Sequence, residues 1–120
     1  MQAAGPERPY TQKLVAQLEK TGRKNKAAIW IAAARRLKSA ARRRPEVNLT
    51  KLNKLAVDGK ITLIPGKLLS LGHVDKAITV AAFAVSKPAR AKVEKAGGKV
   101  MKIDELLAKD PKGSKVTLVV

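Results

Sequence analysis

Apolar residues recur every three or four positions through the first half of the chain, a spacing typical of helices that bury one face. The pattern predicts three helices, over residues 11–22, 25–43 and 47–59. Gly22 is placed to end the first helix, because glycine readily adopts the left-handed conformation that follows many helix ends. Pro45 ends the second helix, since the residue before a proline avoids helical angles. Asn48 can cap the third helix.

Short apolar runs alternate with helical segments in the second half of the chain. The runs predict strands over 61–64, 77–85, 98–103 and 115–120. Two helices are predicted between them, over 86–98 with Ser86 as cap and over 104–110 with Asp104 as cap. Turns are expected at Pro65-Gly66 and at 111–114. This alternation predicts an α/β fold with parallel strand pairs, in which short strands alternate with helices.

The length of 120 residues suits one domain with a modest core. We expect a single domain over 1–120, with a basic helical N-terminal part at 1–46 and an α/β core at 47–120. The chain has no cysteine, which excludes disulfides and thiolate metal sites and fits a reducing compartment. The N-terminus has no apolar stretch like that of a signal peptide. The longest apolar run, 77–85, is far too short to span a bilayer.

Charge changes this picture more than any other feature. Lys and Arg number 26 and Asp and Glu number 9, so the formal net charge is +17. Such self-repulsion opposes a compact monomer, and a polyanionic partner would relieve it. Nucleic acid is the leading class of partner, and an anionic membrane surface is the second. Seven of the eight arginines lie in residues 1–46, and arginine suits bidentate contacts with phosphates and bases.

The second predicted helix has two opposed faces. Its apolar arc consists of Trp30, Ala33, Leu37, Ala40 and Ala41. Its basic stripe consists of Lys24, Arg35, Lys38 and Arg42, flanked by Arg36 and Arg43. No acidic residue lies between Lys24 and Arg44, so the helix lacks the four-residue ion pairs that an ordinary exposed helix would have. A polyanion-binding face is therefore favoured over a merely solvated one.

The aromatic residues are too few for the stacking surfaces of single-strand binders. The chain has one Trp, one Tyr and one Phe. Trp30 falls on the apolar arc, which favours a place in the core. Recognition should therefore rest on phosphates and on the shape of a folded RNA or a duplex.

Catalytic and metal-binding chemistry is disfavoured by the same inventory. His73 is the only histidine, which excludes histidine metal clusters and Ser-His-Asp triads. The carboxylates fall mainly at helix and turn positions where they have structural uses. Gly66-Lys67 lacks the remaining residues of a phosphate-binding P-loop, so Lys67 either contacts phosphate or is solvated. We therefore expect no enzymatic activity, no cofactor, no metal and no small-molecule substrate.

Several stretches resemble one family. VNLTKLNKL (47–55), IPGKLLSLG (64–72), ITVAAFAVSKPARAKVEKAGGKV (78–100) and DPKGSKV (110–116) are similar to the L-eighteen-e family of large-subunit ribosomal proteins. That family occurs in archaea and eukaryotes and is related to the bacterial L-fifteen family. The resemblance runs from about residue 10 to the end and looks archaeal, since the long C-terminal extension of eukaryotic members is absent. The chain departs from the family pattern at Leu71 and His73 and in residues 39–41.

The resemblance implies a structural protein of the cytoplasmic ribosome that binds folded large-subunit ribosomal RNA, lies beside other large-subunit proteins and supports translation. It also implies the shared L-fifteen/L-eighteen-e α/β fold. An architectural protein that binds duplex DNA is the alternative. A membrane-surface role is disfavoured, because the apolar arc of the basic helix is mostly alanine. The residues expected to contact RNA are Arg23, Lys24, Lys26, Arg35, Arg36, Lys38, Arg42, Arg43, Arg44, Lys67, His73, Lys87 and Arg90.

Overall fold

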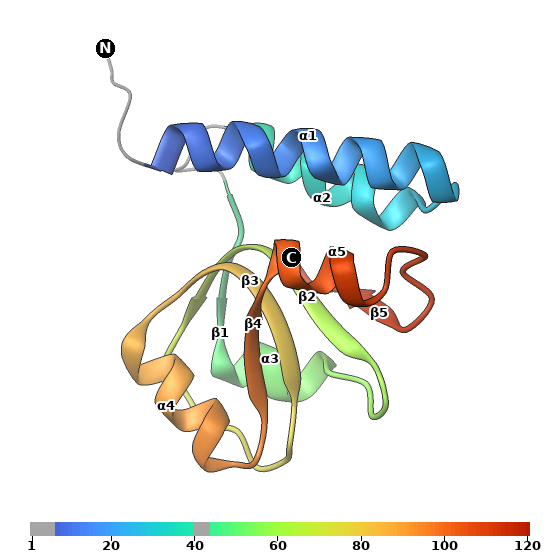
Figure 1. Ribbon diagram of the computed structural model, residues 1–120. Helices are drawn as coiled ribbons and strands as arrows, with labels where there is room; N and C mark the ends of the chain where they lie inside the picture. The colour runs from blue at the N-terminus through green and yellow to red at the C-terminus, as the bar shows by residue number, and fades with distance from the viewer. Residues whose placement is uncertain (1–6, 40–43) are drawn as a thin grey trace.

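The structure of the chain, a computed structural model, describes residues 7–39 and 44–120 (Figure 1). Two antiparallel helices lie over one side of a twisted sheet, and three shorter helices connect the strands. In chain order the elements are α1 (Glu7–Asn25), α2 (Ala28–Lys38), β1 (Glu46–Asn48), α3 (Leu49–Leu55), β2 (Ile61–Leu69), β3 (Thr79–Val85), α4 (Lys87–Lys95), β4 (Lys99–Lys102), α5 (Ile103–Lys109) and β5 (Val116–Leu118).

All the strand pairs of the sheet are parallel, which confirms the predicted α/β class. The strand order is β1-β2-β3-β4, and β5 also pairs with β2. Strand β2 is the axis of the sheet: β3 follows one of its edges, while β5 and β1 share the other. Ile61–Leu63 pairs with β5, and Lys67–Leu69 pairs with β1. The connections between these parallel strands run through helices and loops that cover the two faces of the sheet.

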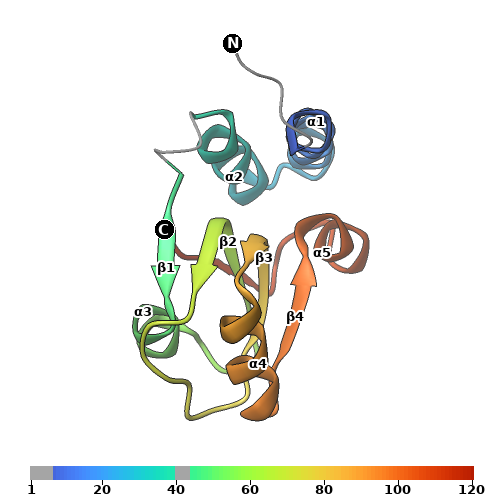
Figure 2. The same ribbon diagram turned by 90° about the vertical axis from the view of Figure 1, so that its left-hand side faces the viewer.

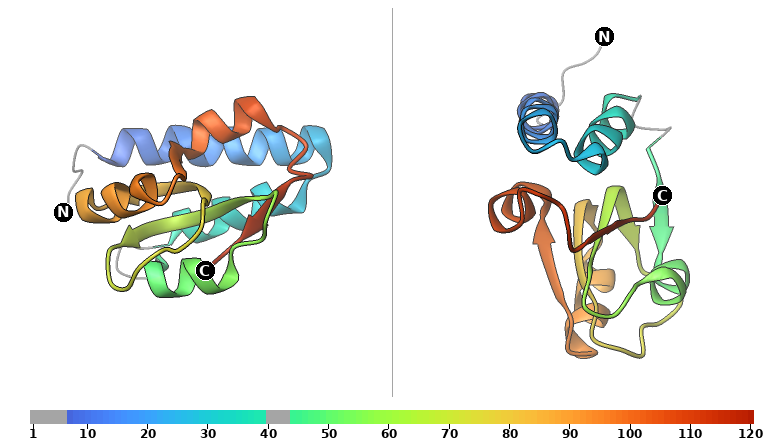
Figure 3. Two further views of the ribbon diagram at one scale, coloured as in Figure 1. Left: turned by 90° about the horizontal axis from the view of Figure 1, so that it is seen from below. Right: turned by 90° about the vertical axis from the view of Figure 1, so that its right-hand side faces the viewer.

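Each face of the sheet packs its own core (Figures 2 and 3). On one face, α1, α2 and α5 bury Leu18, Trp30 and Leu106 against Leu63 of β2. On the other face, α3 and α4 pack against β2 and β3. The buried residues of this second core include Leu49, Leu52, Ile64, Leu68, Val80, Ala89 and Val93. Trp30 is fully buried, as its place on the apolar arc predicts.

The two N-terminal helices differ from the predicted ones in where they meet. Helix α1 continues to Asn25, so the prediction that Gly22 ends it is wrong. Gly22 instead gives room for α2, because a Cβ atom there would lie 2.8 Å from Cδ1 of Ile31. The left-handed turn belongs to Lys26, whose φ is 54°. Helix α2 begins at Ala28, which leaves Lys24 in α1. It ends at Lys38, because Ser39 is extended with a ψ of 159°, so the prediction that Pro45 ends this helix is wrong. The predicted segment 40–43 lies outside the described residues.

The predicted turn at Pro65-Gly66 is also wrong. Both residues lie inside β2, which runs on to Leu69 with an irregular register between Ile64 and Lys67. A Cβ atom on Gly66 would lie 2.0 Å from the carbonyl oxygen of Pro45, and the Lys67 amide donates to that same oxygen at 2.9 Å. Gly66 therefore lies where the backbone of β2 closely approaches the backbone at Pro45.

The predicted third helix divides into a strand and a shorter helix. Strand β1, which begins at Glu46, occupies the first two positions of the predicted helix, and Val47 is fully buried beside Leu68 of β2. Helix α3 follows and ends at Leu55 rather than at residue 59. Asn48 precedes the helix, but its side chain does not cap it: Oδ1 accepts a hydrogen bond from the Leu71 amide at 3.3 Å.

The last two helices follow the prediction more closely. Ser86 caps α4, with its Oγ accepting from the Ala89 amide at 3.3 Å. Helix α5 begins at Ile103, so the cap predicted at Asp104 is wrong. The Glu105 carboxylate accepts from the Lys102 amide at 2.9 Å instead, which places negative charge on the unpaired amides of the first turn.

The turn at 111–114 closes over the tryptophan. Nε1 of Trp30 donates to the Pro111 carbonyl oxygen at 2.8 Å, and a Cβ atom on Gly113 would lie 3.3 Å from the indole ring. The indole N–H is buried, so this bond prevents the cost of an unpaired donor. The DPKG segment (110–113) thus packs against the buried Trp30 and accepts its hydrogen bond.

Candidate nucleic-acid interface

The outer face of α2 presents two arginines to solvent. Arg35 and Arg36 are exposed, while Trp30 and Leu37 on the opposite face are buried, as the helical pattern predicts. In the part of the chain that the structure describes, neither arginine has a carboxylate within ion-pair distance. Their charges are therefore available to an anionic partner.

Lys38 has an acidic partner that the sequence did not reveal. Its Nζ lies 2.5 Å from a carboxylate oxygen of Glu19 in α1. The hydrogen bond from Lys38 lowers the pKa of Glu19, and the positive charges of Lys38 and Arg23 lower it further. The prediction concerned acidic partners at four-residue spacing within the basic helix, and it did not extend to this partner, which comes from the neighbouring helix.

A second basic group lies at the other end of the helical hairpin. Arg23 and Lys24 belong to the last turn of α1, and Lys26 lies in the connection to α2. All three are exposed, and cations at a helix C-terminus interact favourably with the helix dipole. Arg35 and Arg36 follow the start of α2 by about 10–12 Å of helix, which separates them from this group (Figure 1). The single basic stripe predicted from the sequence is thus divided into two groups.

Arg44 packs on an aromatic pair. Its guanidinium lies 4.9 Å from the centroid of the Phe83 ring, and that ring stacks on Tyr10 with centroids 5.9 Å apart. The pKa of Tyr10 is raised by burial, with contributions from the charges of Asp104 and Glu105. A cation–π contact therefore links Arg44, just before β1, to Phe83 of β3. Nothing in the local sequence indicates this pairing, since Phe83 follows much later in the chain.

The carboxyl ends of β2 and β3 gather further predicted residues. Lys67 is exposed and lines a shallow hollow together with Arg44 and Phe83. Lys87 and Arg90 are exposed in the first turn of α4. The amide of Ser86, just before them, donates to the Leu68 carbonyl oxygen at 3.0 Å, which holds the start of α4 beside the end of β2. Arg90 has a weak contact with Glu94 at 4.0 Å.

The remaining predicted residues lie apart or outside the description. His73 is exposed in the loop between β2 and β3. Arg42 and Arg43 fall in the segment 40–43, outside the described residues. Two cations that the sequence analysis passed over, Lys13 and Lys20, are exposed on α1. Their spacing of seven residues, with Lys24 four further on, would have indicated one helix face.

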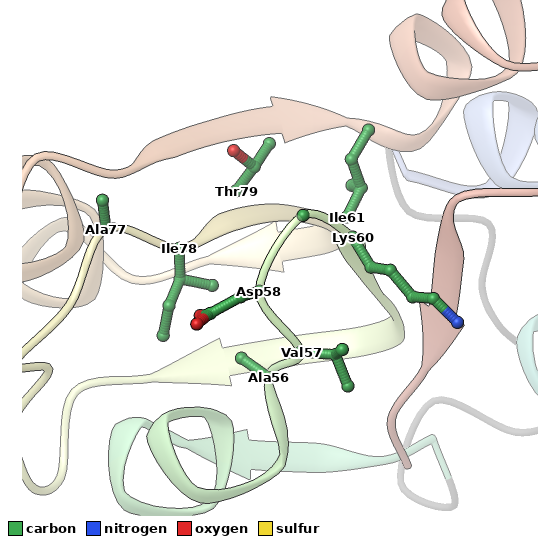
Figure 4. A pocket seen from close by; sticks show the side chains of 9 residues that line it. Ala56, Val57, Asp58, Lys60, Ile61, Ala77, Ile78 and Thr79 are labelled. Carbon is green, nitrogen blue, oxygen red and sulfur yellow. The ribbon is translucent and has the colours of Figure 1, made fainter.

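The structure offers little for catalysis. A hollow at the amino ends of β2 and β3 contains a single carboxylate, Asp58, while the Lys60 side chain points away from it (Figure 4). No group of three or more metal-ligating side chains occurs among the residues searched, 7–39 and 44–120. No helix in those segments is long and apolar enough to cross a membrane.

Comparison with known proteins decides the family. A family model described as "Ribosomal protein 60S L18 and 50S L18e" matches residues 2–120. The chain belongs to this family. The large ribosomal subunit protein eL18 of Methanococcus maripaludis is 43% identical over 111 residues, which cover 92% of each chain. The protein of the same name from Pyrobaculum aerophilum is 41% identical over 97% of this chain and 95% of its own.

Membership of the ribosomal L18/L18e family confirms the resemblance found in the sequence. It also confirms the non-enzymatic interpretation, because the family and its relatives are named as ribosomal proteins. The eL18 protein of Archaeoglobus fulgidus, 43% identical over 81% of this chain and 83% of its own, agrees with an archaeal type. The comparisons give no support to the alternative of a duplex-DNA-binding protein.

Proposed function

We propose that this chain is a structural component of the large ribosomal subunit that binds folded large-subunit ribosomal RNA, mainly through phosphates. Neighbouring large-subunit proteins would be its other partners. The two basic ends of the α1–α2 hairpin and the cations at the carboxyl ends of β2 and β3 would neutralise phosphates of different RNA segments.

The observation that carries this proposal is the imbalance of charge on the hairpin. Among residues 9–39, eight basic side chains accompany one carboxylate, Glu19, and Lys38 already engages it. The eight are Lys13, Lys20, Arg23, Lys24, Lys26, Arg35, Arg36 and Lys38, and all are exposed. Repulsion between such charges destabilises the free chain, and binding to a polyanion relieves it.

The aromatic residues support phosphate recognition over stacking. Trp30 is fully buried, and its indole N–H is engaged by Pro111. Phe83 is packed between Arg44 and Tyr10. The ring faces that a single-strand binder would offer to bases are therefore largely used within the protein.

Removing the two arginines of α2 tests the proposal. Arg35→Gln with Arg36→Gln should weaken binding to cognate large-subunit ribosomal RNA and reduce the slope of log K against log salt by about 1.4–1.8, because each phosphate contact contributes about 0.7–0.9. The matched control replaces Lys60 and Lys115, two exposed lysines at the amino end of the sheet, by glutamine. Both variants carry the same net charge, so a total-charge effect would reduce both slopes equally and contradict the assignment to α2.

Two comparisons test the partner itself. The chain should remain with large subunits through sucrose-gradient sedimentation and leave them only in high salt. Binding to duplex DNA should be weaker than binding to folded ribosomal RNA at matched salt. Equal affinity for both nucleic acids, together with absence from purified subunits, would overturn the proposal in favour of an architectural DNA-binding role.

A further inference from the structure

Leu71 is a large apolar side chain held out into solvent. It is 70% exposed, whereas the next most exposed large hydrophobic residue of the described segments, Val57, is 46% exposed. It lies in the loop that follows β2, and this loop passes between α3 and α4 (Figures 1 and 2). Single exposed leucines are common on protein surfaces, so exposure alone does not indicate a binding site. The conformation of the backbone around Leu71 is the additional evidence.

That backbone is fixed by hydrogen bonds on both sides of the side chain. The Leu71 amide donates to Oδ1 of Asn48 at 3.3 Å, and its carbonyl oxygen accepts from the Thr50 amide at 3.2 Å. Nζ of Lys92 donates to the carbonyl oxygens of Ser70 and Gly72 at 3.0 and 3.2 Å. Three consecutive carbonyl groups of a surface loop are thus bound to α3 or α4.

Gly72 fixes the loop further. Its φ of 95° belongs to the left-handed region that favours glycine, and a Cβ atom there would lie 1.9 Å from Oγ1 of Thr50. Only glycine lets the loop approach α3 this closely. Several contacts therefore hold the backbone at this exposed leucine in place, and a fixed loop loses little backbone entropy when a partner covers it.

The charges around Leu71 indicate what kind of partner covers it. The exposed cations of α3 and α4, on either side of the loop, outnumber their one carboxylate, Glu94. They are Lys51, Lys54, Lys87, Arg90, Lys92 and Lys95. Asp75 adds one negative charge to the loop itself. A partner that matches Leu71 and the surrounding cations would have an apolar surface flanked by anionic groups. The faces of nucleic-acid bases, flanked by backbone phosphates, have both properties.

We propose that Leu71, carried on a fixed backbone, is an apolar wedge that packs against the base faces of an RNA segment whose phosphates the surrounding lysines contact. This inference rests on the proposed function and adds a base-contacting site to it. The phosphate contacts fix the position of the RNA, and the leucine packs where a base step is open or a base is unpaired. No charge changes at this site, so its contribution to binding does not depend on salt.

Three variants of the full chain separate this wedge from the phosphate contacts. Leu71→Gln removes the apolar surface, Leu71→Phe retains it, and Leu55→Gln is the matched control at a leucine that is 43% exposed on α3. Binding to protein-free cognate large-subunit ribosomal RNA should weaken by about five- to thirty-fold for Leu71→Gln at every salt concentration, with an unchanged salt slope. Leu71→Phe and Leu55→Gln should bind like the wild type.

The outcomes distinguish the wedge from the proposed function. A wild-type chain that fails to bind the RNA overturns both. A wild-type chain that binds while Leu71→Gln binds equally well overturns the wedge alone. The chain lacks cysteine, so Leu71→Cys carries a photocrosslinker at a single site, and in assembled subunits it should crosslink to RNA. Crosslinking to a neighbouring protein instead would replace the wedge with a protein contact.

Discussion

Replacing Gly66 by alanine should separate two backbones that the native chain packs in direct contact. The new Cβ atom would lie 2.0 Å from the carbonyl oxygen of Pro45, and such atoms do not approach within 3.0 Å, so the two segments must move apart by at least about 1 Å. The hydrogen bond from the Lys67 amide to the same oxygen is 2.9 Å long and would not survive that movement. The pairing of β1 with β2 begins at Lys67, so the strain reaches the sheet.

The size of the effect follows from these contacts. Overpacking in a close-packed site costs about 1–3 kcal/mol. Loss of the hydrogen bond adds about 0.5–1.5 kcal/mol. The smaller conformational freedom of alanine in the unfolded chain offsets about 0.4–1 kcal/mol. We therefore expect a loss of about 2–3 kcal/mol in the free energy of unfolding, a large part of the total for a domain of this size.

Urea unfolding measured by the fluorescence of Trp30 is a suitable assay, since this is the only tryptophan and it is fully buried. Gly59→Ala is the control, because that glycine has a φ of 81° and open space around it. The control should lose about 1 kcal/mol from backbone strain alone. If Gly66→Ala unfolds within about 0.5 kcal/mol of the wild type, the contact with Pro45 does not constrain β2 and our account of this motif is refuted.

Three further substitutions have definite expected outcomes. Trp30→Phe removes the indole donor from the Pro111 oxygen and should cost about 1.5–3 kcal/mol, measured by circular-dichroism melting; an unchanged melting temperature would contradict the role of this bond. Lys26→Gly relieves a left-handed lysine and should stabilise the chain by about 1 kcal/mol in urea unfolding, whereas a loss would show that the strain is absent. Glu19→Gln frees Lys38 and should tighten RNA binding in a filter-binding assay. The pKa of Glu19 is lowered in the folded chain, so its stabilising contribution is present above its ordinary pKa of 4.5 and disappears as the pH falls through the folded value. The wild type should therefore lose its higher free energy of unfolding relative to Glu19→Gln in that pH range. Parallel pH dependence of unfolding for the two chains would contradict this assignment.

Patterns that depend on neighbours in sequence predicted most of the elements. The alternation of apolar runs and helical segments gave the parallel α/β class, and the burial of Trp30 followed from the helical period of α2. The cap at Ser86 is equally local, since its Oγ binds an amide three residues ahead. For Trp30 and Ser86 the residues that decide the structure lie within a few turns of one helix, and the α/β class follows from the order of such local segments.

Features that depend on distant contacts could not be predicted in the same way. Gly22 and Gly66 carry the local signals of a helix end and a turn, yet each lies inside an element and in close contact with a distant residue, Ile31 and Pro45 respectively. The candidate interface shows the same limit, because Lys38 finds its carboxylate on the adjacent helix. The cations predicted from the sequence to bind RNA therefore include some that already contact other groups within the folded chain.

The glycines of the motifs that identify the family and the α2 arginines proposed to bind RNA have different physical roles. Two of the motifs contain glycines in close contact with another part of the chain: in 64–72, Gly66 contacts Pro45 and Gly72 contacts Thr50, and in 110–116, Gly113 contacts Trp30. These contacts specify how the sheet, the loop and the final turn pack, whatever the chain binds. The unpaired arginines of α2 lie outside the motifs and carry the information about an anionic partner. The family match over residues 2–120 includes these arginines, so the two sets overlap in sequence. They differ in kind, because the glycine contacts concern packing while the exposed charge favours an anionic partner.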